Sequence, residues 1–311
     1  MERAVIEVFG GCNYKCKMCP QTTGRQSSFL RKMPLDMFES ILDQLPGKPI
    51  INLEGSGEPT MVEDLDKYIS ACSSRGLKSF IYCNGSGFTD NLMTRCLDAG
   101  LTYIRFSMIG YTPVLYKEWM SEDNWGLIVR NIQDTKSYIA QNNLNCTVAS
   151  YHLILNKDLI DYEVDQYKNN IIDNLDTVGY IWLQHNWSGN YQPGYTRKGK
   201  RRSCGRPFAN EITVRAGGID GLQGAVTPCC QTLGPPNESA SVLGHFQNQT
   251  FDDIWYGDDY NHLRKAHELG EWPSYCENCD FLYEDREVLV WSNDPNAKIG
   301  RMIGTKLEIA Q

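Results

Sequence analysis

Short, β-rich apolar segments alternate with amphipathic segments of helix length from residue 4 to about residue 187, and this alternation constrains the fold most. The predicted strands are residues 4–9, 49–54, 78–83, 102–108, 146–155 and 178–185. The predicted helices are residues 34–45, 62–76, 89–100 and 124–142. Strands that alternate with helices in this way form parallel pairs joined by crossover helices. The pattern therefore predicts an α/β fold, a partial (β/α)6 barrel and not a complete eightfold barrel.

The character of the sequence changes near its residues 190–208, which are polar, basic and rich in turn-forming residues. The segment 211–230 then predicts a β-hairpin that ends in a cysteine pair, and the segment 251–270 predicts two helices joined by a turn. We therefore predict two domains: the partial barrel over residues 1–195 and a small, cysteine-rich α+β domain over residues 196–311.

Charge and hydropathy exclude several classes of protein. The net charge is −8 and the isoelectric point is about 5.2, whereas a broad nucleic-acid-binding surface is usually strongly basic. The sequence has no apolar stretch long enough to span a membrane, and it does not open with the basic and apolar regions of a secretory signal. We expect a cytoplasmic protein that binds neither nucleic acid nor membranes.

The 12 cysteines fall into two groups and a few isolated positions. Clustered cysteines in a reducing compartment more often hold metal or perform redox chemistry than form disulfides. The first group is Cys12, Cys16 and Cys19, spaced C-x3-C-x2-C just after the first predicted strand. Iron–sulfur clusters of the [4Fe-4S] type are normally held by four thiolates, so three leave one iron open to another ligand. A zinc site that borrows a fourth ligand, or plain buried cysteines, are the alternatives.

This spacing after a first strand resembles the signature of the radical S-adenosylmethionine (SAM) enzymes. The resemblance implies that Cys12, Cys16 and Cys19 hold a [4Fe-4S] cluster whose open iron binds the amino and carboxylate groups of SAM. It further implies that reduction cleaves SAM and releases a 5′-deoxyadenosyl radical, which takes a hydrogen atom from the substrate. A flavodoxin- or ferredoxin-type protein would donate the electron.

Four further segments resemble motifs of that family, and together they imply a set of SAM-binding residues. The segments are GSGEP at 55–59, YCNGSG at 82–87, RFSMIG at 105–110 and LQHNWSG at 183–189. The implied cofactor-binding residues are Gly57, Glu58, Asn84, Ser107, Arg130, Gln184, His185 and Asn186. We expect Gly57 to let the backbone approach the ligand closely and Glu58 to accept from the SAM ammonium.

The second cysteine group resembles the C-terminal module called SPASM, or its shorter form, twitch, over residues 204–280. The full module has seven cysteines and two auxiliary clusters, whereas this region has five cysteines, which implies one auxiliary [4Fe-4S] cluster. The implied ligands are Cys204, Cys229, Cys276 and Cys279, with Cys230 spare. The alternatives are that Cys230 replaces Cys229 as a ligand, or that the region is a zinc ribbon.

Two cysteines outside these ligand sets, Cys83 and Cys230, are candidate catalytic residues, as donors of a hydrogen atom to a product radical. We expect a small polar substrate, such as a sugar, an aminocyclitol or a nucleotide-linked sugar, and a reaction of oxidation or epimerisation. The first strand begins within the first few residues and leaves no room for a leader-peptide recognition domain, which favours the small substrate. The alternative is a peptide- or protein-modifying maturase. A non-catalytic iron–sulfur carrier is a minor alternative, because GSGEP and RFSMIG imply a nucleoside and amino-acid pocket.

Overall fold

The computed structural model describes residues 1–23, 29–192, 199–232, 237–283 and 289–297. The predicted boundary between residues 195 and 196 lies outside the described residues, as does the end of the predicted second domain from residue 298 onward.

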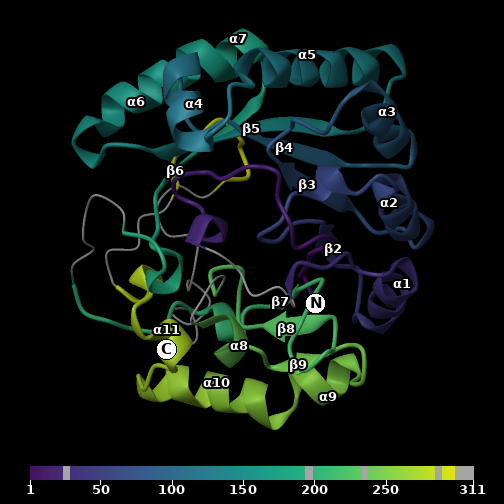
Figure 1. Ribbon diagram of the computed structural model, residues 1–311, viewed down its shortest axis with the longest axis vertical. Coiled ribbons are helices and arrows are strands. Elements are labelled where there is room, and N and C mark those ends of the chain that lie inside the picture. Colours follow the sequence, from purple (N-terminus) through teal and green to yellow (C-terminus); the bar gives the residue numbers. More distant parts are fainter. Residues whose placement is uncertain (24–28, 193–198, 233–236, 284–288, 298–311) are drawn as a thin grey trace.

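One ten-stranded sheet runs through the molecule in the order β10-β6-β5-β4-β3-β2-β1-β7-β8-β9 (Figure 1). Its first six strands in the sequence are β1 (Arg3–Ile6), β2 (Ile50–Asn52), β3 (Ser79–Cys83), β4 (Tyr103–Ser107), β5 (Thr147–Ile154) and β6 (Val178–Leu183). All neighbours among these six pair in parallel. The six predicted strands are therefore confirmed, and so is the partial barrel.

Helices connect these strands and lie along the outer side of the sheet (Figure 1). They are α1 (Leu35–Gln44), α2 (Leu65–Ser74), α3 (Asp90–Asp98), α4 (Pro113–Met120), α5 (Trp125–Gln141), α6 (Ile160–Tyr167) and α7 (Asp173–Leu175), with a π-helical turn (Lys168–Ile172) between the last two. The four predicted helices are confirmed by α1, α2, α3 and α5. The sequence analysis missed α4, α6 and α7. Of these, α4 begins with Pro113 after a Thr112 N-cap whose side chain accepts from the Leu115 amide.

The strands bury one face against the helices and leave the other partly accessible. Along β3, β4 and β6, buried residues alternate with partly accessible ones. Ile104 and Phe106 of β4 are fully buried, and Tyr103, Arg105 and Ser107 alternate with them. Because side chains alternate across a strand, these accessible residues point away from the helices, toward the inside of the barrel. We call this side the inner face.

The C-terminal region extends the same sheet at both of its edges. Its elements are β7 (Glu211–Val214), β8 (Ala225–Thr227), α8 (Asn237–Ala240), β9 (Gly244–His245), α9 (Phe251–Trp255), α10 (Asp258–Leu269), α11 (Ser274–Glu277) and β10 (Leu289–Ser292). The predicted hairpin is confirmed, since β7 and β8 pair antiparallel, and the predicted helix pair is α9 and α10. The sheet shows a continuity that the sequence did not predict, because β7 also pairs in parallel with β1 and β10 pairs antiparallel with β6.

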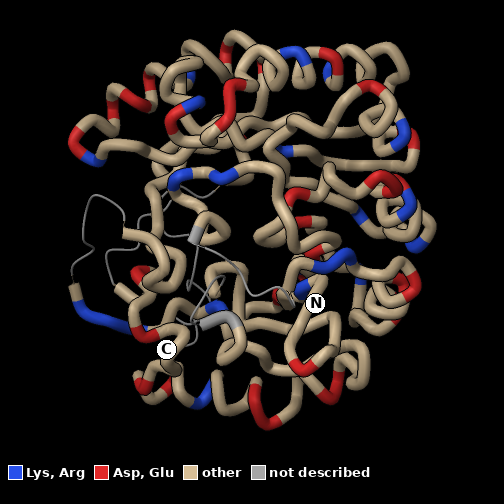
Figure 2. The backbone as a smooth tube through the Cα atoms, in the orientation of Figure 1, with Lys and Arg blue, Asp and Glu red and all other residues tan. Residues whose placement is uncertain are grey.

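Short 3-10 helices complete the fold at Pro20–Thr23, Pro59–Met61, Lys157–Leu159, Trp187–Gly189, Arg206–Phe208 and Asp280–Leu282. Lys and Arg are interspersed with Asp and Glu along the peripheral helices (Figure 2). Among the described residues, no helix combines the length and the apolar character needed to cross a bilayer.

Candidate functional site: two cysteine groups and the inner face of the barrel

The first cysteine group lies on one loop, between β1 and α1. The Cys19 amide donates to the Cys16 carbonyl at 3.0 Å, and the Tyr14 amide donates to the Cys12 sulfur at 3.4 Å. All three cysteines of the group, Cys12, Cys16 and Cys19, are free thiols of intermediate burial. The loop therefore brings the predicted three ligands together, with one backbone donor already directed at a sulfur.

Burial and neighbouring negative charge disfavour thiolates at this loop. Burial and, to a smaller extent, the negative charges of Glu58 and Cys19 together raise the pKa of Cys12 to about 12. Burial, followed by the charges of Cys19 and Cys12, raises the pKa of Cys16 well above its ordinary value. Three thiolates at this place therefore need a cationic partner, which iron would provide. This donor set fits an iron–sulfur cluster.

Neither cysteine group is arranged for a single metal ion. Within the part of the chain that the structure describes, no three or more His, Cys, Asp or Glu side chains are placed so as to hold one ion. A [4Fe-4S] cluster makes a different demand on its ligands, because each cysteine sulfur binds a separate iron atom.

The GSGEP segment packs directly on the cysteine loop. A Cβ at Gly57 would lie 1.8 Å from the Phe9 carbonyl oxygen and 2.7 Å from the Gly11 carbonyl oxygen, and the Glu58 amide donates to the latter at 2.8 Å. Gly57 thus permits close contact between two chain segments. We expected this glycine to permit the approach of a ligand, and the space is instead filled by backbone.

The Glu58 carboxylate is buried beside the cysteine loop and is held by three donors. It accepts from the Thr60 amide at 3.0 Å, the Thr60 hydroxyl at 2.6 Å and the Asn84 amide at 2.7 Å. Burial raises its pKa. Because an ionised carboxylate accepts about four hydrogen bonds, one position remains for a donor such as an ammonium group.

Asn84 connects the end of β3 to the cysteine loop. Its side-chain amide donates to the Asn13 side-chain oxygen at 2.9 Å, and its own oxygen accepts from the amide and the hydroxyl of Ser86. The Asn13 amide group in turn donates to the Ser86 hydroxyl at 2.9 Å. The structure therefore brings Glu58 and Asn84 together with the loop, and it adds Asn13, Thr60 and Ser86, which sequence reasoning missed.

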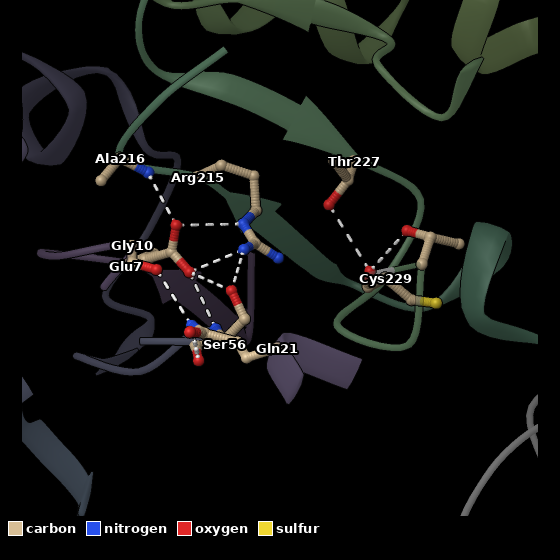
Figure 3. Close-up of polar contacts among 9 residues, drawn as sticks. Glu7, Gly10, Gln21, Ser56, Arg215, Ala216, Thr227 and Cys229 are labelled. Carbon is tan, nitrogen blue, oxygen red and sulfur yellow. Dashed lines mark hydrogen bonds and ion pairs between the residues drawn. The ribbon is translucent and has the colours of Figure 1, made fainter. Parts of the chain in front are cut away.

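A buried ion pair joins GSGEP to the C-terminal region (Figure 3). Arg215, just after β7, donates to the Glu7 carboxylate at 2.7 Å, and both residues are 1% exposed. The same carboxylate accepts from the amide and the hydroxyl of Ser56, each at 2.8 Å, and from the Ala216 amide at 3.3 Å. Gln21, from the cysteine loop, donates to the Ser56 carbonyl. Glu7 and Arg215 are 208 residues apart, so no local pattern signals this pair.

Two other residues predicted to contact SAM, Ser107 and Arg130, lie in different parts of the fold. Ser107 ends β4 on the inner face, in register with Tyr151 of β5. Arg130 is exposed on α5, a helix whose buried residues include Ile128 and Ile132. The structure therefore places Ser107 at the inner face and does not bring Arg130 to it.

The residues after β6 hold the second cysteine group. The Asn186 amide donates to the Asp280 carboxylate at 3.1 Å, its side chain donates to the Asn278 carbonyl at 2.7 Å, and the Asp280 amide donates back to the Asn186 side chain at 3.1 Å. His185 packs against Trp187, with ring centroids 4.2 Å apart, whereas Gln184 is 3% exposed. The polar groups of Asn186 thus position residues 278–280, a role that sequence reasoning missed.

The second cysteine group gathers four thiols from three separate segments. Burial raises the pKa of Cys276, and the charges of Cys229, Cys204 and Cys279 raise it further. Burial, with the charges of Cys204 and Cys229, raises the pKa of Cys279 well above its ordinary value. Cys229 accepts from the amides of the next residues, Gln231 and Thr232. The same four residues that we predicted as ligands therefore lie within electrostatic range of one another.

Cys230 differs from these four in its surroundings. Arg206 donates to its sulfur at 3.6 Å. Burial raises the pKa of Cys230 to about 11, Arg206 lowers it, and the charges of Cys229, Glu211 and Glu54 raise it. Glu54 follows β2, so the Cys230 thiol lies within electrostatic range of the carboxyl end of this barrel strand.

The other candidate donor, Cys83, lies on the opposite side of the sheet from the inner face. It is 2% exposed and alternates along β3 with the partly accessible Tyr82. Burial raises its pKa well above its ordinary value, and the charges of Glu58 and then of Cys96 of α3 contribute. The structure therefore groups Cys83 with the core under the helices and does not bring it together with Cys230.

Two family models match the chain. The model described as the radical SAM superfamily matches residues 6–158, and the model described as an iron–sulfur cluster-binding domain, SPASM, matches residues 221–280. Both predicted resemblances are thereby confirmed.

Two curated relatives match parts of the chain. A tungsten-containing aldehyde ferredoxin oxidoreductase cofactor-modifying protein from Pyrococcus furiosus is 28% identical over 111 residues, and an uncharacterized protein from Methanocaldococcus jannaschii is 24% identical over 136 residues. The matches cover 35% and 43% of this chain, and 31% and 43% of those proteins. The chain thus spans less than half the length of each relative that it matches.

Solved structures share the fold. BtrN in complex with AdoMet and 2-DOIA has a TM-score of 0.60 at 17% identity, covering 94% of this chain and 100% of BtrN. SuiB from Streptococcus suis, bound to the precursor peptide SuiA, has a TM-score of 0.63 at 14% identity, covering 90% of this chain and 70% of SuiB. With its three-cysteine loop, its partial barrel and its C-terminal cysteine group, the chain belongs to the radical SAM superfamily and carries a SPASM iron–sulfur cluster-binding domain.

Proposed function

We propose that this radical SAM enzyme abstracts a hydrogen atom from a small polar substrate, such as a sugar, an aminocyclitol or a nucleotide-linked sugar, and so oxidises or epimerises it. The observation that carries this proposal is the inner face of the barrel. Tyr82, Arg105, Tyr151 and Trp182 are partly accessible there, whereas their neighbours along the strands are buried. Aromatic rings combined with polar donors suit a compact, hydroxyl-bearing substrate.

The two cysteine groups divide the binding of the cofactors between them. In this proposal Cys12, Cys16 and Cys19 hold the SAM-binding [4Fe-4S] cluster, and Cys204, Cys229, Cys276 and Cys279 hold the auxiliary cluster. When bound, these groups supply the reductive cleavage of SAM to a 5′-deoxyadenosyl radical and, at the auxiliary site, an acceptor for one electron. A flavodoxin- or ferredoxin-type protein is the proposed electron donor.

The chain itself positions SAM and keeps the site ordered. Glu58 accepts from the SAM ammonium through its remaining lone-pair position, while Thr60 and Asn84 fix its carboxylate. Ser107, at the end of β4, lies on the inner face where it can contact the same ligand. Gly57 acts indirectly, by seating GSGEP on the cysteine loop. Arg130, exposed on α5, has no part in this proposal.

Cys230 decides between the two outcomes. Its thiol is spare in the proposed ligand set and lies within electrostatic range of Glu54. Delivery of a hydrogen atom from this thiol to the substrate radical gives epimerisation with no net oxidation of the substrate. It leaves a thiyl radical at Cys230, which one electron from the proposed flavodoxin- or ferredoxin-type donor and one proton would convert back to the thiol. Loss of one electron and one proton from that radical instead gives a product lighter by two hydrogens.

Peptide or protein modification is the second candidate, because the fold likeness to SuiB includes a structure with a bound precursor peptide. BtrN, whose structure holds 2-DOIA, shares the fold to a similar degree. These likenesses concern the fold, so the choice rests on the inner face and on the experiment below.

The test is an anaerobic incubation of the cluster-loaded protein with SAM, dithionite and a pool of deuterated sugars and aminocyclitols. We expect deuterium in 5′-deoxyadenosine, and the product mass then distinguishes oxidation from epimerisation. SAM cleavage without deuterium transfer would contradict the small-substrate proposal and favour a peptide. No cleavage by protein with intact clusters would contradict catalysis and favour the iron–sulfur carrier.

A further inference from the structure

Arg105 stands out among the inner-face residues because no residue in the described part of the chain gives its guanidinium a polar partner. It lies on β4 between the strands β3 and β5 (Figure 1). Among the described residues, none accepts a hydrogen bond from Arg105 or forms an ion pair with it, and its Nε is buried without a partner. A buried donor left unsatisfied is destabilising, so a group that completes this site is favoured.

Two aromatic rings hold the guanidinium in place. Its central carbon lies 3.5 Å from the centroid of the Tyr82 ring and 4.6 Å from the centroid of the Tyr151 ring. Cation–π contacts on two sides restrict the arginine side chain and leave the edges of the guanidinium, which carry the N–H groups, for other contacts. The donors are therefore preorganised before any ligand binds.

The acidic neighbour of Arg105 does not neutralise it by direct contact. Glu54 is close enough that the Arg105 charge lowers its pKa, although burial raises that pKa more. Its carboxylate accepts from the Asn52 side chain at 3.1 Å, and no ion pair within 4.0 Å joins it to Arg105 among the described residues. An arginine with a purely structural role would be expected to form an ion pair with this carboxylate, since burying a charge without an opposite charge beside it is costly.

Two further buried polar atoms on inner-face side chains have no hydrogen-bond partner among the residues that the structure describes, and they come from other strands. They are the Asn52 side-chain oxygen of β2 and the indole nitrogen of Trp182 in β6. Both residues belong to the inner face. Asn52 is in register with Phe80, which lies on the same side of β3 as Tyr82. Trp182 is partly accessible and lies between the buried residues Ile181 and Leu183. With Arg105 they provide one acceptor and two donors on three alternate strands.

We propose that Arg105 binds a carboxylate or phosphate oxyanion of the substrate, so that the enzyme acts on an acidic, hydroxyl-bearing small molecule. This inference rests on the small-substrate function proposed above and names the substrate class for that site. A planar guanidinium binds an oxyanion with two parallel N–H donors, which also fixes the orientation of the bound molecule. Asn52, Glu54 and Trp182 are then available to the hydroxyl groups.

The test measures binding to the cluster-loaded protein without turnover, in the presence of SAM and without reductant. Three probes of similar size are compared by ligand-observed NMR titration: glucuronate, glucose 6-phosphate and neutral glucose. We expect at least one acidic probe to bind about 10- to 100-fold more tightly than glucose, which is the range for a charge-assisted hydrogen bond. The tighter of the two acidic probes identifies carboxylate or phosphate as the natural group.

The Arg105→Gln variant should remove this preference, and Arg105→Lys should retain only part of it because an ammonium group cannot form the paired contact. Arg75→Gln is the matched control, since Arg75 pairs with Asp43 on the surface of the molecule. Equal binding of all three probes to the natural protein would overturn the proposal. So would an Arg105→Gln variant with full iron content and an unchanged preference for the acidic probe.

A second readout separates this inference from the function on which it rests. The second readout is deuterium transfer from the probes to 5′-deoxyadenosine, measured in the natural protein. If the natural protein transfers deuterium from neutral sugars as well as it does from acidic ones, the small-substrate function stands and the oxyanion inference fails. If it transfers deuterium from none of them while cleaving SAM, the function itself fails.

Discussion

The two cysteine groups reach similar chemistry by opposite routes. Cys12, Cys16 and Cys19 lie within eight residues on one loop, whereas the second group draws on Cys204, Cys229, Cys276 and Cys279, spread over more than 70 residues. The first three are of intermediate burial, and three of the four in the second group are buried. In the proposed assignment a local loop therefore holds the cluster whose open iron binds SAM, and an assembled, largely buried set holds the auxiliary cluster.

The supporting contacts differ in the same way. The first loop is held by hydrogen bonds to the ends of neighbouring strands, through Asn84, Glu58 and Gln21. The second group depends on contacts between distant segments, such as Asn186 with Asp280. We therefore expect substitutions at the first loop to abolish chemistry with little effect on folding, and substitutions around the second to act on both.

The largest effect is expected from replacing Cys12, Cys16 and Cys19 together by alanine. Reductive cleavage of SAM should fall to background, because no thiolate remains to hold the SAM-binding cluster. Iron should drop from about eight to about four atoms per chain, since the auxiliary cluster stays. Iron analysis and chromatography of 5′-deoxyadenosine measure both, and cleavage at the natural rate would show that this loop is not the cofactor site.

Next comes a matched pair in the second group, Cys276→Ala and Cys230→Ala. The first should lose the auxiliary cluster and about four irons, because a ligand is missing. The second should keep its iron, since the charges that act on Cys230 are those of Arg206, Cys229, Glu211 and Glu54, and the proposed ligands Cys204, Cys276 and Cys279 are not among them. Iron loss from Cys230→Ala with retention in Cys229→Ala would exchange the two assignments.

A smaller effect is expected where the two regions meet. Arg215→Met leaves the Glu7 carboxylate buried without its cation, which should lower the free energy of unfolding by about 3–5 kcal/mol. Thermal unfolding of the cluster-loaded protein measures the change. Glu7→Gln combined with Arg215→Met should recover part of it, because no unpaired charge is then buried, whereas the surface variant Arg75→Gln should behave like the natural protein. Equal losses in the single and double variants would contradict this account.

The smallest effect concerns pH and the second region alone. Burial lowers the pKa of His267 from 6.5 to about 4, and its ring contacts the Ser203 hydroxyl at 3.0 Å. Because the folded pKa lies below the unfolded one, stability is fully present above pH 6.5 and is lost as the pH falls toward 4. Between pH 7 and pH 5 the loss should be about 1–2 kcal/mol.

Urea unfolding of the natural protein and of His267→Gln at the two pH values measures this effect. The variant should lose less stability on acidification. His262→Gln is the control, because His262 is exposed on the same helix. An identical loss in the natural protein and in His267→Gln would remove His267 as the cause.

Much of the fold could be predicted from the sequence because its elements are encoded locally. Alternation of strands and helices predicted β1 to β6 and four of their helices, and turn-forming residues predicted the β7–β8 hairpin. Helices α4, α6 and α7 were missed, since each is short, with eight residues in α4 and α6 and three in α7. The pairing of β7 with β1 could not be predicted, because it joins residues about 200 positions apart.

The candidate site divides in the same way. Short sequence motifs were enough to identify Cys12, Cys16, Cys19 and Glu58, and the structure brings these residues together. Asn13, Thr60 and Ser86 were missed because single polar residues beside a motif carry no signal of their own. We expected Asn186 to bind SAM, whereas the structure shows that its polar groups form hydrogen bonds with Asn278 and Asp280.

The sequence by itself determined the α/β class, the three-cysteine loop and the superfamily, because strand–helix alternation and motif spacing are properties of neighbouring residues. Only the tertiary structure decided that the C-terminal region extends the barrel sheet and that Glu7 pairs with Arg215. It also decided that Arg105 is held between Tyr82 and Tyr151, with no polar partner among the described residues. The physical reason is that burial and charge pairing depend on distances in space, and those distances are set only when the strands associate.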